Sequence, residues 1–210
     1  MKKRGNVVFN NVFTLAYKNC TPNETLSLFL QEKTSQDIIE FGIPHLPEQL
    51  KIEIEVISHD SFLKKLSETS LPCPIQHFCI TYSDSFIHCI DYAAIYKQVS
   101  VEKYLKSIRH ECIHILQHLA TRIAPQSAVW LYESIACARA EQKTATPTKI
   151  PSWDDFVTKF YAQPDCYALA YTFGINLLNH TSLNMLAKQC ENFDFFTKEC
   201  EKIYSKIFNK

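Results

Sequence analysis

Positions 109–117 read Arg-His-Glu-Cys-Ile-His-Ile-Leu-Gln, and this stretch decides what kind of fold the chain can adopt. Successive residues of an α-helix are rotated by about 100°, so His110 and His114 differ by roughly 40° and lie one turn apart. Both imidazoles can therefore reach one metal ion. Glu111 stands between them in the sequence and would flank the metal without binding it.

A third ligand has to come from another segment, and Glu133 is the best candidate. Eighteen residues, 115–132, separate it from His114. That length lets the first helix end, the chain turn near 124–126, and a second helix bring a carboxylate back to the histidines. Glu133 lies in the sequence Trp-Leu-Tyr-Glu-Ser-Ile-Ala at positions 130–136.

The whole pattern of His-Glu-x-x-His, eighteen residues and Trp-Leu-x-Glu-x-x-Ala resembles the gluzincin branch of zinc metallopeptidases. Within that branch it looks most like the small peptidase-MA-like domains and the catalytic core of the M1 aminopeptidases. The resemblance covers roughly residues 48–190 and is specific at 110–136. A metzincin would need Gly at position 117 and His at position 120, where this chain has Gln117 and Ala120.

The resemblance implies an α+β fold of the zincin type. A small twisted β-sheet and the metal-binding helix are followed by a mostly helical C-terminal lobe. Residues 1–210 would form a single two-lobed domain. The sheet and metal helix would occupy residues 1–122, and the helical lobe with the third ligand would occupy 123–210.

The resemblance also implies a reaction, the zinc-dependent hydrolysis of a peptide bond in a peptide or protein substrate. Zn²⁺ would be bound by His110, His114 and Glu133, and it would polarise the scissile carbonyl and activate water. Glu111 would be the general base. Thermolysin-like members carry an Asp four residues after the ligand Glu to orient a metal histidine, whereas this chain has Cys137.

The substrate would be bound by a strand. In gluzincins the edge strand just upstream of the metal helix pairs with an extended peptide, and the resemblance places that role on residues 86–91, with Ile87, His88 and Cys89 as substrate-binding residues. The M1 signature Gly-x-Met-Glu-Asn, which anchors a free substrate N-terminus, is absent hereabouts. Endopeptidase and exopeptidase activity both remain open.

Tyr167 begins the segment Tyr-Ala-Leu-Ala-Tyr, which resembles the downstream helix of peptidase-MA-like domains, whose leading Tyr lies near the active site. A phenol there can stabilise a tetrahedral oxyanion. Tyr171 and His180 are alternatives for this role. An ordinary aromatic core helix would show the same periodicity.

Two other interpretations of the metal motif stay open. A regulatory protease that cleaves a repressor also carries His-Glu-x-x-His-x-x-x-His, and His118 fits that pattern, although its ligand Glu usually lies farther downstream. A catalytically silent, zinc-stabilised interaction module would keep the ligands but would have no need of Glu111. In the peptidase interpretation, three protein ligands leave the fourth position for water, so His118 is expected beside the site or in solvent.

Composition excludes several classes of partner. The 22 basic and 22 acidic residues balance, so nothing indicates nucleic acid or an anionic membrane. No apolar run approaches the 18 or so residues of a membrane span. The N-terminal Met-Lys-Lys-Arg followed by 7–9 is similar to the start of a signal peptide, but Asn10, Asn11 and Lys18 interrupt it, and a first strand is predicted instead.

The nine cysteines are scattered and odd in number, with no Cys-x-x-Cys pair. This pattern argues against a disulfide framework and implies a reducing compartment. A cytoplasmic location is expected, with secretion as the weaker alternative.

Local patterns predict the remaining elements. Residues 50–57 alternate apolar and charged side chains, which indicates a strand with one face in water. Residues 77–82 and 86–90 form two further strands joined by a tight turn at 83–85. Residues 142–151 form a polar linker.

Helix starts are predicted from capping residues. Thr-Pro-Asn-Glu at 21–24 is a capping box with Pro at the first helical position, and its helix ends at Gly42. Ser100 caps the metal helix, expected at 101–122. The other predicted caps are Asp60, Ser152, Thr181 or Ser182, and Asp194.

Overall fold

The computed structural model describes residues 5–9, 13–18, 20–43, 52–67, 78–83 and 86–208. The chain divides into two compact units, and each is described by itself. The first comprises residues 1–37 and 44–115, and the second comprises 38–43 and 116–210. The boundary falls inside two helices, α1 (Glu24–Glu40) and α4 (Val101–Thr121).

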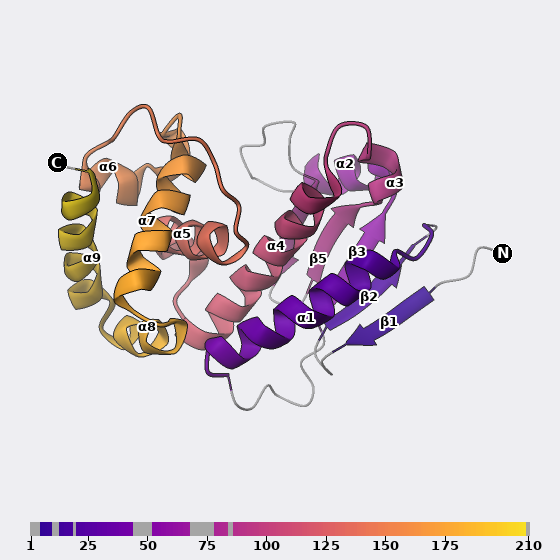
Figure 1. Ribbon diagram of the computed structural model, residues 1–210, viewed down its shortest axis with the longest axis horizontal. Helices are drawn as coiled ribbons and strands as arrows, with labels where there is room; N and C mark the ends of the chain where they lie inside the picture. Colours follow the sequence, from indigo (N-terminus) through magenta and orange to yellow (C-terminus); the bar gives the residue numbers. More distant parts are fainter. Residues whose placement is uncertain are drawn as a thin grey trace. The chain divides into compact units, whose positions relative to one another are not determined.

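The first unit contains a five-stranded mixed sheet with strand order β1-β2-β3-β5-β4. Figure 1 labels β1, β2, β3 and β5 in this order. The strands of the sheet are β1 (Gly5–Phe9), β2 (Phe13–Tyr17), β3 (Ile52–Ile57), β4 (Cys79–Ser83) and β5 (Phe86–Ile90). The outer pairs β1/β2 and β4/β5 are antiparallel, and β3 is parallel to both of its neighbours, β2 and β5. Together with the helical second unit, this sheet confirms the predicted α+β class.

One face of the sheet packs against α4. The Tyr104 hydroxyl donates a hydrogen bond to the Ile90 carbonyl at 2.9 Å and lies 3.9 Å from Cys89 Sγ. Ile54, Val56 and the first half of α1 add apolar side chains that are almost completely buried. A sheet face covered in this way needs continuous apolar contact, which the alternate residues of the strands supply.

The prediction that 86–91 form an edge strand is wrong. β5 pairs with β3 on one side and with β4 on the other, so its backbone groups are used inside the sheet. Ile87 and Cys89 are buried beneath α4, and His88 points to the opposite face of the sheet. β4 precedes β5 in the chain yet lies outside it, and within the described ranges β4 pairs with β5 alone.

The prediction that the strand at 50–57 has one face in water is wrong at Glu55. This side chain is only 3% exposed because β3 lies in the middle of the sheet, where its carboxylate pairs with Lys18 and with His88. The strand itself is present as β3.

The caps of the first two helices each lie two residues away from the predicted caps. Asn23 caps α1, since its Oδ1 accepts the N–H of Leu26 at 3.0 Å; Thr21 does not. Gly42 ends the turn after α1 as predicted, with a φ of 64° that favours glycine. Ser58 lies before α2 (His59–Ser67) and its Oγ accepts the N–H of Ser61, so Asp60 is inside the helix.

The helix predicted at 101–122 is confirmed as α4, and Ser100 caps it by accepting the N–H of Lys103 at 3.2 Å. It follows the short α3 (Tyr92–Ile95), whose cap is Asp91. The apolar stripe of α4 is buried except at Leu119, which is partly exposed; it consists of Tyr104, Leu105, Ile108, Cys112, Ile115, Leu116 and Leu119. An amphipathic pattern with a period near 3.6 residues thus orients this helix.

The second unit is helical throughout its described elements. These are η1 (Pro125–Ser127), α5 (Val129–Arg139), α6 (Trp153–Thr158), η2 (Phe160–Ala162), α7 (Cys166–His180), α8 (Leu183–Gln189), η3 (Cys190–Asn192) and α9 (Phe193–Phe208). Ser152 and Ser182 cap α6 and α8 as predicted. Asn192 takes the place of Asp194 at the start of α9, because its Oδ1 accepts the N–H of Phe195 at 3.3 Å.

α5 is the central helix of this unit. Gly174 on α7 meets the Ser134 carbonyl so closely that any Cβ there would collide with it. Trp130 packs edge-on against Trp153, with ring centroids 5.0 Å apart, and also against Phe156 and Phe173. Every residue from 130 to 138 is therefore buried, which places Glu133 inside a rigid apolar setting.

The described helices include none with the length and apolar character that crossing a membrane requires.

Candidate metal and catalytic site

His110 and His114 lie one turn apart on α4, as their spacing predicts. Their rings meet edge to face, with centroids 4.5 Å apart and planes at 90°. His110 is 5% exposed, while His114 is half-buried. Two imidazoles held on one face of a helix in this way can bind a common cation.

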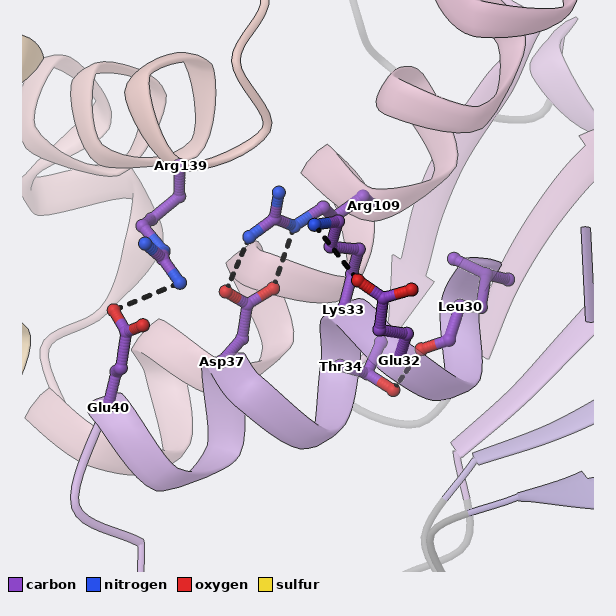
Figure 2. Close-up of polar contacts among 8 residues, drawn as sticks. All are labelled: Leu30, Glu32, Lys33, Thr34, Asp37, Glu40, Arg109 and Arg139. Carbon is purple, nitrogen blue, oxygen red and sulfur yellow. Dashed lines mark hydrogen bonds and ion pairs between the residues drawn. The ribbon is translucent and has the colours of Figure 1, made fainter. Parts of the chain in front are cut away.

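A buried ion pair anchors α4 one residue before His110. Arg109 donates to Asp37 of α1 through Nε at 2.9 Å and through Nη2 at 2.8 Å, a two-pronged contact drawn in Figure 2. Asp37 is fully buried and Arg109 is 2% exposed. Planar bidentate pairing of this kind fixes direction as well as distance, so it sets the rotation of α4 about its axis.

Glu111 faces the edge strand β4. Its Oε2 accepts hydrogen bonds from the Thr81 backbone N–H at 2.8 Å and from the Thr81 hydroxyl at 2.6 Å. The two residues are 30 positions apart in the sequence. No local pattern in the chain indicated this contact, because nothing in a strand sequence identifies which helix residue will reach it.

In the second unit, Glu133 is 6% exposed and its carboxylate is held by a tyrosine that the sequence analysis missed. The Tyr161 hydroxyl donates to Glu133 Oε1 at 2.7 Å. Tyr161 belongs to the short η2, 28 residues after Glu133. A 3₁₀ helix of three residues is too short to give a periodic signal, so the sequence did not indicate this contact.

Cys137 lies one turn after Glu133 on α5 and is buried. Residues four apart on a helix share a face, so the thiol and the carboxylate point the same way. Thiolate and carboxylate are both ordinary zinc ligands.

Tyr167, the residue predicted to stabilise an oxyanion, begins α7 and is half-buried, with its ring edge-on to Phe160 at 6.4 Å. Of the two alternatives, Tyr171 is half-buried one turn further along, and His180 is exposed with Nδ1 2.7 Å from the Asn176 carbonyl. His118, at the end of α4, has Nδ1 3.2 Å from the Ile123 carbonyl.

The buried thiols are poor candidates for a nucleophile. Burial raises the pKa of Cys79 and of Cys112 well above the usual range, and it raises that of Cys166 to about 11. Since the thiolate is the reactive form, these groups stay protonated and unreactive near neutral pH. Six cysteines in the described part of the chain have free thiols: Cys79, Cys89, Cys112, Cys166, Cys190 and Cys200.

His88, predicted to bind substrate, belongs instead to a polar cluster on the far face of the sheet. Its Nδ1 lies 3.2 Å from Glu55 Oε2, and Lys18 pairs with the same carboxylate. Burial, aided by Lys65 and Lys18, lowers the pKa of His88 to about 4. The ammonium of Lys18 already offsets the charge of Glu55, so desolvation dominates and His88 is neutral in the fold.

This lowered pKa predicts an acid-sensitive fold. The pKa of a histidine in an unfolded chain is about 6.5. The stability that neutral His88 gives to the folded state is therefore complete above about pH 6.5 and is lost as the pH falls toward about 4. Between pH 7 and 5 the free energy of unfolding should fall by about 2 kcal/mol more in the wild type than in His88→Gln. Urea titrations at both pH values measure the difference, and equal slopes with pH for the two proteins would contradict it.

The predicted site residues fall into three places. In the first unit, α4 carries His110, Glu111 and His114, and the inner strand β5 carries Ile87, His88 and Cys89. In the second unit, α5 carries Glu133 and α7 carries Tyr167. Neither a protein-family model nor a curated protein matches the sequence.

Proposed function

We propose that the chain is a zinc-dependent peptidase of the gluzincin type, with zincin-like architecture, which hydrolyses a peptide bond in a peptide or protein substrate. The observation that carries this proposal is the pair of imidazoles on one face of α4, with ring centroids 4.5 Å apart and Glu111 beside them. The spacing to Glu133, on a helix of its own, supports the same conclusion.

The donor set fits zinc. His110, His114 and Glu133 supply two nitrogens and one oxygen, which is the complement of an open catalytic zinc site. Two of the three are almost fully buried, and both helices that carry them are rigidly packed. A bound zinc would supply Lewis-acid activation of water and of the scissile carbonyl.

The chain's own residues would then move the protons. Glu111 takes a proton from the attacking water and later delivers it to the leaving amine. Tyr167 is the first candidate for a hydrogen bond to the oxyanion. With β5 inside the sheet, the backbone edge proposed to pair with an extended substrate is that of β4, since it lies next to Glu111.

Cys137 favours a second candidate, a zinc-stabilised interaction module without catalysis. Structural zinc sites have four protein ligands, whereas catalytic sites have three and one open position. A buried thiol one turn from Glu133 is suited to be the fourth ligand. Ligand number therefore separates the two functions.

We also propose a reducing, cytoplasmic setting. Support comes from the scattered spacing of the nine cysteines and from the free thiols of Cys79, Cys89, Cys112, Cys166, Cys190 and Cys200.

Zinc content tests the ligand set. The wild type should bind one zinc per chain, and His110→Ala, His114→Ala and Glu133→Ala should each lose it. Tyr161→Phe should keep the zinc but bind it about 10- to 100-fold more weakly, since it removes the hydrogen bond that orients Glu133. Elemental analysis and competition with a chromophoric chelator measure these values.

His118→Ala is the matched control on the same helix and should bind zinc as the wild type does. Cys137→Ser decides between the candidates: unchanged affinity supports the open site of a peptidase, and loss of zinc supports the closed site of a module. Undiminished zinc in Glu133→Ala would remove that residue from the ligand set.

A further inference from the structure

We propose that Thr81 is a positioning residue for the general base. Its two donors hold the carboxylate of Glu111 in one orientation and leave Oε1 as the oxygen that exchanges protons with water and with the leaving amine. This inference rests on the proposed peptidase function and assigns a role to a residue that the metal motif does not include.

Both hydrogen bonds reach the same oxygen. The Thr81 N–H lies 2.8 Å from Glu111 Oε2, and the Thr81 hydroxyl lies 2.6 Å from it. Hydrogen bonds to a carboxylate are short and about twice as strong as neutral ones. A glutamate side chain has several free torsions, so two such bonds from one residue select a single rotamer.

The sheet explains why this N–H is available. Ile90 donates its N–H to the Phe78 carbonyl at 2.9 Å, so residues 78 and 90 form a hydrogen-bonded pair of the β4–β5 ladder. Backbone groups in an antiparallel ladder alternate in direction, and with 81 opposite 87 the N–H of Thr81 points away from β5. The register shifts between Thr81 and Ser83, as it does at bulges that re-aim a strand beside a site.

The contact with Glu111 gives an acceptor to the Thr81 N–H, a backbone donor at the edge of the sheet. An edge N–H that points outward needs an acceptor, and here the acceptor is the side chain that the reaction requires. The Thr81 hydroxyl adds the second bond, and it is the part that mutation can remove. Thr81→Val keeps the shape of the side chain and the backbone N–H, and Thr81→Ser keeps both donors.

Steady-state kinetics on a cleaved peptide give the first test. Thr81→Val should lower kcat by about 10- to 100-fold at unchanged zinc content and with little change in KM, because the lost bond orients the base and not the substrate. Thr81→Ser should restore kcat to near the wild-type value. A wild-type kcat in Thr81→Val, or failure of Thr81→Ser to restore it, would overturn the positioning role.

A second test does not depend on activity. The thermal midpoints of wild type, Thr81→Val, Glu111→Ala and the double variant form a double-mutant cycle. Thr81→Val should lower the midpoint in the wild type but have almost no effect once Glu111 is alanine. Equal losses in both backgrounds would show that the contact does not exist and would overturn the inference. A wild type that binds zinc but cleaves nothing would instead refute the proposed function, so the two failures are distinct.

Discussion

Replacement of Glu111 by Gln is expected to lower kcat for peptide cleavage by about 10²- to 10⁴-fold while zinc content and fold stay the same. Glutamine is nearly isosteric, and its carbonyl oxygen can still accept the two hydrogen bonds from Thr81. What it loses is basicity, so it cannot take a proton from water or return one to the leaving amine. The loss should be in kcat and not in KM, since the residue acts on the water and not on the substrate.

The measurement is cleavage of an unfolded-protein or peptide-library substrate, followed by mass spectrometry, at equal zinc occupancy. Glu102→Gln is a matched control: the same substitution on the same helix, at an exposed residue paired with Lys106. It should cleave as the wild type does. Equal cleavage by the Glu111 variant would exclude general-base catalysis there, and no cleavage by any of the three proteins would favour the zinc-stabilised module.

Removal of the buried carboxylate at Asp37 is expected to cost about 3–5 kcal/mol of unfolding free energy. Asp37→Ala leaves the Arg109 guanidinium buried without its acceptor, and an uncompensated buried charge is far costlier than the loss of an exposed contact. The effect should reach the site, because Arg109 directly precedes His110 on α4. Denaturant unfolding measures the change.

Figure 2 also shows the ion pair between Glu40 and Arg139, which serves as the control for Asp37→Ala. Glu40 lies on the same helix, α1, and pairs with Arg139 at 2.9 Å, but its side chain is 38% exposed. Glu40→Ala should therefore cost no more than about 1 kcal/mol. A double replacement of Asp37 and Arg109 by apolar residues of similar volume should recover most of the loss. Equal losses for the two alanine variants would contradict the role given to the Asp37–Arg109 pair.

Features governed by neighbours along the chain could be predicted from sequence. The 3.6-residue period put His110 and His114 on one face of α4, and the hydroxyls of Ser100, Ser152 and Ser182 marked three helix starts correctly. These are interactions between residues three or four positions apart, whose geometry the helix itself fixes. The α+β class was implied by the resemblance to gluzincins and not by these local patterns. Zinc binding and peptide hydrolysis, which rest on a motif, stay predictions.

Features governed by distant residues were decided by tertiary structure alone. The order of strands placed β5 inside the sheet and β4 at its edge. Side chains alternate along β5, so His88 lies on the face away from Cys89 and α4, next to the buried Glu55. Arg109 and Asp37 are 72 residues apart. Strand pairing and side-chain contacts across such separations depend on the packing of the whole unit, and no local periodicity records them. The sequence by itself therefore identified the candidate site residues, and the fold decided that Thr81 and Tyr161 form hydrogen bonds to two of them, Glu111 and Glu133.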